Sequence, residues 1–157
     1  MDMVAFFRIA SRAHFARVWR AYKAGNRLKG EDKRFAERMA AHPEWTEWWE
    51  QADEPEDVEV LTPEGTDPFA ALAVEVAVEG MIGRNEDKVA RKTYRKLRSD
   101  GLTHEEARAE IGQVFVGVLW EVGKGRVAPE NQLERFDEAL RLRAAGQGPE
   151  KIFPGWD

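Results

Sequence analysis

The apolar run DPFAALAVEVAVEGMIG at residues 67–83 constrains the fold of this chain more than any other segment. Its small and apolar residues are interrupted by only two acids, Glu75 and Glu79. A membrane-spanning helix needs about 20 apolar residues, so this run is too short and too charged to be a span. It predicts instead a buried helix over 68–82, for which Asp67 is a favourable N-cap.

Apolar residues recur with helical spacing along most of the remaining sequence. Glycines and prolines at the ends of the periodic segments indicate where the helices stop. The other segments expected to form helices are 11–25, 28–43, 42–52, 86–101, 103–123 and 129–146.

Two segments lack this periodicity. Residues 53–66, DEPEDVEVLTPEGT, combine acids with prolines and a glycine, which predicts a long acidic loop inside the domain. Residues 146–157 predict an irregular tail. The pattern as a whole therefore predicts one all-α domain, 1–157, built as a single-domain helical bundle of about six helices.

The helix predicted over 104–122 is apolar on nearly all sides, which is typical of a central helix. Its interior also contains Gly112 and Gly117, each of which costs roughly 1 kcal/mol relative to alanine. We therefore expect another element to approach this helix closely. The alanine-rich helix 68–82 is the partner that we predict, and the two would form the centre of the bundle.

Composition excludes several classes of site. The chain of 157 residues contains no cysteine, which excludes disulfides, thiolate nucleophiles and cysteine metal sites and favours a cytoplasmic location. The N-terminus does not have the pattern of a signal peptide. No serine–histidine–acid set, phosphate-binding glycine loop or H-E-x-x-H motif is present, so we expect no enzyme. The net charge of -5 does not favour a polyanionic partner.

The two glutamates of the apolar run lie four residues apart and therefore on one face of the helix. Two interpretations are open. Glu75 and Glu79 point inward and bind a metal or move a proton, or they form the solvent-facing edge of a buried helix. An unpaired buried carboxylate is expensive, which favours the second interpretation.

The segment TPEGTDPFAALAVEVAVEGMIG, with AHPEW before it and GLTHEEARAEIGQVFVGVLWEV after it, resembles a bacterial family catalogued as a domain of unknown function, number eighteen forty-one. The resemblance spans roughly Phe15 to Ala144. It implies a helical fold with histidines in i, i+4 pairs on the two central helices. The matching positions in this chain are Ala71, Glu75, Glu105 and Ala109.

None of those four positions is a histidine here, so the resemblance implies a member whose histidine site has been lost. Alanine cannot bind a metal, and two carboxylates alone hold a transition metal poorly. We expect no cofactor. The alternative is a divalent-metal protein that uses Glu75 and Glu105, with His104 as a neighbouring ligand.

The helix within 86–101 carries a basic stripe at i, i+3, i+4, i+7 and i+8. Such a stripe can lie along a phosphate backbone, which makes a nucleic-acid-associated protein a second alternative. It can equally be a solvated face or pair with the acidic segment. The nucleic-acid candidates are Lys88, Arg91, Lys92, Arg95 and Lys96.

Aromatic residues in the segment 42–52 and in the tail indicate protein contacts, because exposed aromatic patches mark interfaces. We therefore predict a non-catalytic cytoplasmic interaction or scaffold protein that binds a protein partner or itself, as a homodimer or other homo-oligomer, without a membrane. The predicted interface residues are Trp45, Trp48, Trp49, Phe153 and Trp156.

Overall fold

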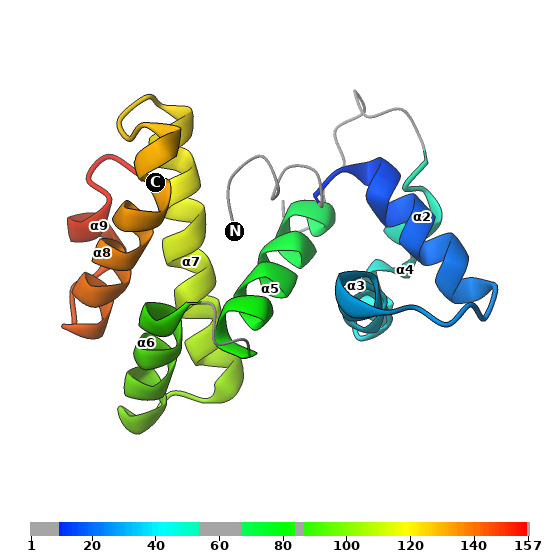
Figure 1. The fold of residues 1–157 in the computed structure, drawn as a ribbon, viewed down its shortest axis with the longest axis horizontal. Helices are drawn as coiled ribbons and strands as arrows, with labels where there is room; N and C mark the ends of the chain where they lie inside the picture. The colour runs from blue at the N-terminus through cyan, green and yellow to red at the C-terminus, as the bar shows by residue number, and fades with distance from the viewer. Residues whose placement is uncertain (1–9, 54–66, 84–86, 157) are drawn as a thin grey trace. The chain divides into compact units, whose positions relative to one another are not determined.

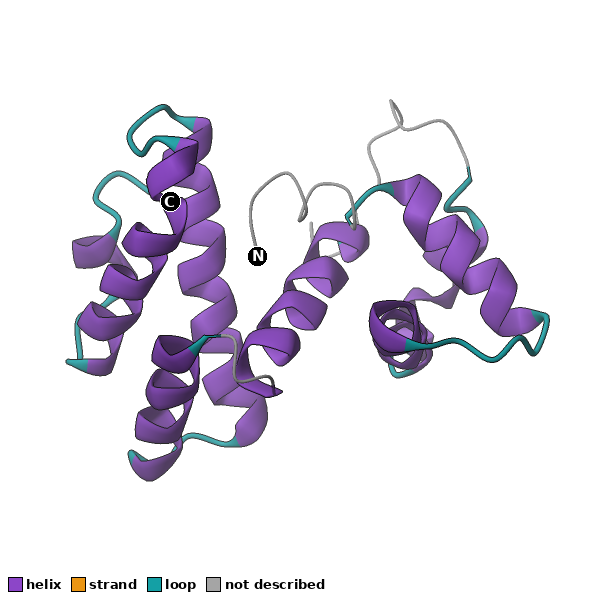
Figure 2. Ribbon diagram, in the orientation of Figure 1, coloured by secondary structure: helices purple, strands orange, loops and turns teal. Residues whose placement is uncertain are grey.

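The computed structural model describes residues 10–53, 67–83 and 87–156, which form helices joined by loops (Figure 1). These residues contain no strand (Figure 2), so the predicted all-α class is confirmed. The chain divides into two compact units, residues 4–76 and residues 77–157 together with 1–3. Their described parts are called here the N-terminal unit and the C-terminal unit. A single domain over 1–157 stays a prediction, and the loop predicted at 53–66 lies, except for Asp53, outside the described residues.

The N-terminal unit is built from helices whose ends follow local signals. Ser11 caps the first of them by accepting a hydrogen bond from the backbone N–H of His14 at 3.3 Å. Asp67 caps α5 in the same way, with the N–H of Phe69 at 2.9 Å from its Oδ1 atom. The elements are α2 (Arg12–Lys23), α3 (Gly30–Ala40), η1 (Pro43–Trp45), α4 (Thr46–Glu50) and the first part of α5 (Pro68–Gly83).

Aromatic rings fill the core of the N-terminal unit. The Phe15 ring, which is fully buried, stacks on Trp49 at a centroid distance of 5.6 Å and meets Phe35 and Phe69 edge-on at 5.4 and 5.1 Å. The indole N–H of Trp49 donates to the carbonyl of Met39 at 3.0 Å, so its one polar group is satisfied inside the core. One ring on each of α2, α3, α4 and α5 therefore joins these helices.

The C-terminal unit is arranged around α7 (His104–Gly123), which packs against both α6 (Lys88–Ser99) and α8 (Gln132–Ala144). Thr103 and Glu106 form a capping box at its start. The unit also contains the second part of α5, η2 (Pro129–Asn131) and α9 (Pro149–Ile152). None of the described helices has both the length and the apolarity required to cross a membrane.

Ion pairs reinforce the packing of α8 on α7. The guanidinium of Arg135 donates to Glu121 at 2.7 Å, and that of Arg143 donates to Glu110 at 2.8 Å. Arg135 also donates to the carbonyl of Ile152 at 2.6 Å, which ties the C-terminal segment to the same helix. Two of the basic residues of α8 are therefore used to hold the unit together.

The close approach predicted at Gly117 occurs, but its partner is not the one expected. A Cβ atom added to Gly117 would lie 2.6 Å from the Cδ2 and Cζ atoms of Phe153, which is fully buried. The ring from the C-terminal segment thus occupies the space that we assigned to the alanine-rich helix. The tail expected to be irregular contains the short helix α9, and Ile152 and Phe153 are part of the core.

Two large apolar residues lie at the surface. Leu133 is 52% exposed and Tyr22 is 43% exposed. Leu133 lies in the first turn of α8 and Tyr22 in the last turn of α2. Tyr22 stacks on Trp19 at a centroid distance of 5.5 Å, so part of its ring is still covered.

Replacing Gly117 with alanine should destabilise the protein by about 1–3 kcal/mol, because the new methyl group overlaps the buried Phe153 ring. This loss exceeds the gain of about 1 kcal/mol in helix propensity. Chemical denaturation measures the difference. Gly123→Ala on the same helix is the control, since nothing lies within 4 Å of its added Cβ. A Gly117→Ala variant as stable as Gly123→Ala would contradict this packing.

Candidate functional site

Glu75 lies at the centre of a hydrogen-bonded cluster in the N-terminal unit. Its Oε2 atom accepts from Nη2 and Nε of Arg38, at 2.9 and 3.2 Å, and lies 2.9 Å from Nε2 of His42. The Glu75 side chain is 25% exposed, and the pairing compensates for the burial of the rest. Glu75 is thus a partly exposed, ion-paired carboxylate, and its use as a metal ligand stays a prediction.

His42 bridges two carboxylates. Its Nδ1 atom lies 2.7 Å from Glu44, and its ring stacks on Trp45 at a centroid distance of 4.3 Å. The two ring nitrogens of His42 therefore lie within hydrogen-bond distance of two different carboxylates, Glu44 and Glu75. The hydrogen bond from His42 lowers the pKa of Glu44. Arg38, His42, Glu44 and Glu75 thus form one connected cluster.

The second acid of the apolar helix is paired within the C-terminal unit. Arg108, whose side chain is 6% exposed, donates to both Glu79 and Glu105. Burying a guanidinium is tolerable only when it is paired, and two carboxylates meet that need. Glu79 therefore stabilises the buried guanidinium of Arg108. The Glu105 side chain, which is 70% exposed, pairs with the same guanidinium from the surface.

The predicted metal ligands do not converge within either unit. Glu75 belongs to the N-terminal unit, and Glu105 and His104 belong to the C-terminal unit. His104 interacts through Nδ1 with the hydroxyl of Tyr94 at 2.7 Å. Among the described residues, no three acidic or histidine side chains are grouped as metal ligands. A metal at Glu75 and Glu105 stays a prediction.

The five aromatic residues of the predicted interface differ in how deeply they are buried. Trp49 and Phe153 are 1% and 0% exposed, so neither contributes to an exposed patch. They are core residues of the two units because each fills space between helices. Trp45, Trp48 and Trp156 are partly exposed, and their role in protein contacts stays a prediction.

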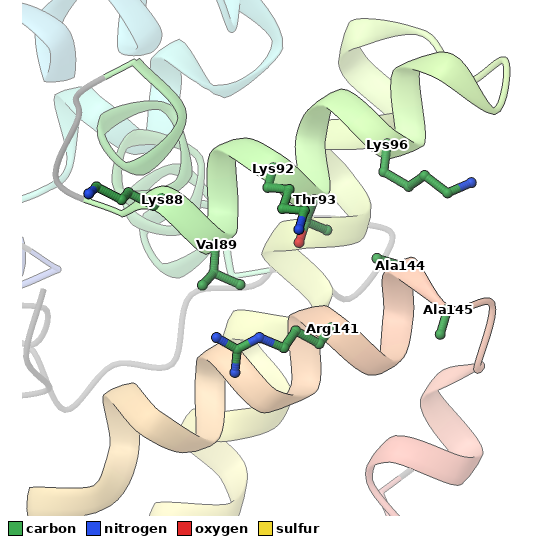
Figure 3. Close-up of a pocket in the computed structure, with 8 residues that line it drawn as sticks. All are labelled: Lys88, Val89, Lys92, Thr93, Lys96, Arg141, Ala144 and Ala145. Atoms are coloured by element: carbon green, nitrogen blue, oxygen red, sulfur yellow. The ribbon is translucent and has the colours of Figure 1, made fainter.

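A groove lies between α6 and α8 in the C-terminal unit (Figure 3). Its volume is about 540 Å³, which is within the range of ligand sites. Figure 3 shows Lys88 and Lys96 extending toward opposite ends of α6, with Val89 and Thr93 between them. The residues that line it are Lys88, Val89, Lys92, Thr93, Lys96, Arg141, Ala144 and Ala145.

Sequence and local packing explain why the groove has this form. Asp87 caps α6 by accepting from the N–H of Ala90 at 2.9 Å. The face of α6 that carries Ala90, Thr93 and Leu97 is buried in the unit. Lysines four residues apart therefore form a row beside this buried face and border the groove.

Most of the cations in the groove have no carboxylate bonded to them. In the described part of the chain, Lys88, Lys92 and Arg141 form no ion pair within 4.0 Å, whereas Lys96 lies 2.5 Å from Asp100. The negative charge of Asp137, one turn before Arg141 on α8, partly offsets the positive charge of Arg141. The groove therefore presents concentrated positive charge above apolar surface.

Asp137 has an unfavourable position of its own. Its Oδ1 atom is buried without a hydrogen-bond partner. Burial raises the pKa of Asp137, the nearby charge of Asp87 raises it further, and Arg141 partly opposes both. The carboxylate is thus poorly placed to neutralise the groove.

The groove includes three of the five basic residues predicted to bind nucleic acid. Lys88, Lys92 and Lys96 line it, whereas Arg91 and Arg95 do not. Arg141 was missed by the sequence analysis, because it lies on a helix far along the chain. The signal available was its position near the end of α8, where a basic residue is also favoured by the helix dipole.

Comparison with protein families identifies the chain. The model of the family described as Domain of unknown function (DUF1841) matches residues 8–136. The chain belongs to this family. The match covers the α6 wall of the groove and ends before Arg141, Ala144 and Ala145. No curated protein and no solved structure matches.

Replacing Glu75 with alanine should lower the free energy of unfolding by about 1 kcal/mol, because a partly buried, charge-assisted cluster is lost. Glu37→Ala is the matched control from the same unit. Glu37 lies 3.9 Å from Lys33 with both side chains 63% exposed, and such a surface pair contributes little. Equal stability of the two variants in denaturant titrations would rule out a stabilising role for the Glu75 cluster.

Replacing Asp137 with asparagine should stabilise the protein more at pH 7 than at pH 3. Burial raises the pKa of Asp137 in the folded state, so the native protein binds this proton more tightly than the unfolded chain does. The stability of the native protein therefore falls as pH rises from the unfolded-state pKa through the folded-state pKa. We expect a gain of about 0.5 kcal/mol at pH 7 relative to pH 3. Glu134→Gln, an exposed charge on the same helix, controls for net charge. A pH-independent effect of Asp137→Asn would contradict this assignment.

Proposed function

We propose that the protein is a non-catalytic interaction protein that binds an anionic partner in the groove between α6 and α8. The observation that carries this proposal is the set of cations, Lys88, Lys92 and Arg141, that border one hollow without an ion pair in the described residues. Concave sites lined by charge of one sign attract ligands of the opposite sign.

The other basic residues of α8 support this interpretation. Arg135 and Arg143 each pair with a glutamate of α7, at 2.7 and 2.8 Å. The sequence contains 29 acids and 24 basic residues, so acids are not scarce. That Lys88, Lys92 and Arg141 have no ion pair among the described residues of an acidic protein is better explained by binding than by chance.

The chemistry of the lining residues supports binding without catalysis. They offer ammonium and guanidinium groups, one hydroxyl and apolar surface. They include neither a carboxylate nor an imidazole, the groups that most often act as general bases. The predicted self-association is not needed for this function and stays a prediction.

The proposal is tested by titrating the full-length protein with labelled anions at low salt. The probes are pentaglutamate, a short single-stranded oligonucleotide and inorganic polyphosphate. Fluorescence anisotropy of the labelled probe measures binding. We expect at least one probe to bind, with affinity that falls as salt is raised. Lys92→Gln should weaken that binding by about fivefold, the equivalent of about 1 kcal/mol.

Arg95→Gln is the matched control, because Arg95 is an exposed cation of the same helix that does not line the groove. It should leave the affinity nearly unchanged. Failure of every probe to bind at low salt would overturn the proposal. An equal loss of affinity in both variants would show that the groove is not the binding site.

A further inference from the structure

We propose that the occupant of the groove is a short, extended segment of a partner protein in which acidic and apolar residues alternate. This inference rests on the proposed function and specifies the partner of the same site. It follows from three properties of the groove: its size, the spacing of its cations and the nature of its floor.

The length of the hollow suits a short extended chain. The lining part of α6 runs from Lys88 to Lys96, about 12 Å at 1.5 Å per residue. An extended segment covers the same distance with about four to five residues.

The spacing of the lysines matches the repeat of an extended chain. Lys88, Lys92 and Lys96 follow one another at intervals of about 6 Å along the helix. Alternate side chains of an extended segment lie about 6.6–6.8 Å apart on one face. The flexible stems of the lysines take up the small difference. Acids at every second position can therefore be reached by Lys92 in the middle of the groove and by Lys88 and Lys96 toward its two ends, although Lys96 is shared with Asp100.

The floor of the groove accommodates the side chains between the acids. Val89 lies on the α6 side, and Ala144 and Ala145 lie at the end of α8. Small apolar residues of the partner can be buried on this surface, at a gain of about 25 cal/mol per Å². A segment of acids alone would leave the floor without a partner, so alternation fits better than a continuous acidic run.

The same features disfavour nucleic acid. Single-stranded nucleic acid gains affinity from bases stacked on aromatic rings, and no aromatic residue lines the groove in the described part of the chain. The net charge of -5 opposes a long polyanion over the whole surface. A short acidic segment needs only the local positive charge.

The experiment compares labelled peptides on the full-length protein at physiological salt. The probe is the pentapeptide Glu-Val-Glu-Val-Glu with blocked ends. Its control is Glu-Glu-Glu-Val-Val, which has the same composition and charge. We expect the alternating peptide to bind about fivefold more tightly than the control, and Lys92→Gln to remove most of this advantage. Arg95→Gln should retain it.

A floor variant tests the apolar contribution separately. Val89→Ser should weaken the alternating peptide and leave the affinity for pentaglutamate unchanged, and circular dichroism confirms that the variant is folded. Several outcomes would overturn the inference while leaving the proposed function intact. These are equal binding of the two pentapeptides, tighter Lys92-dependent binding of an oligothymidylate, or tighter binding of a helical peptide with acids four residues apart. The absence of all anion binding would overturn both.

Discussion

The pairing of the two carboxylates of α5 is the constraint on which much of the structure depends. This helix is apolar on almost every side, and ionised acids are costly in such surroundings. Glu75 is met by Arg38 and His42, and Glu79 is met by Arg108. Each pairing lies within one compact unit, so the two acids, one turn apart on one helix, serve different units.

These pairings also limit where chemistry can take place. The Oε2 atom of Glu75 already accepts from a guanidinium and lies against an imidazole, so a metal ion at that atom would compete with these partners. Of the four positions at which the family resemblance implies ligands, Glu75 and Glu105 have ion-pair partners in this chain, and the other two are alanines. The groove between α6 and α8 is a different case, because Lys88, Lys92 and Arg141 line it without an ion pair among the described residues.

The local features of the fold could be predicted from the sequence. Asp67 caps its helix as expected, and Ser11 and Thr103 cap theirs by the same kind of local contact, because capping depends on residues two or three positions apart. Their spacing of four residues likewise predicted that Glu75 and Glu79 lie on one face of their helix. The cations that meet them could not be predicted, since each comes from an element distant in the sequence.

Packing between distant elements escaped prediction for the same reason. The glycine pattern of α7 indicated a close approach, but spacing alone did not reveal that the Phe153 ring fills the place beside Gly117. Likewise, the basic stripe of α6 was visible in the sequence, yet its division between groove and open surface depends on where α8 packs. Arg141 joins the site only through that packing.

The groove is formed by the core of its own unit, and this has a consequence for binding. Ala90, Thr93 and Leu97 of α6 and Ala139 and Leu140 of α8 are buried, so both walls are fixed before any partner arrives. A partner then loses its own conformational freedom while the site loses little, and such preorganisation favours affinity for a short segment. Because both walls belong to the C-terminal unit, the shape of the groove is set within that unit.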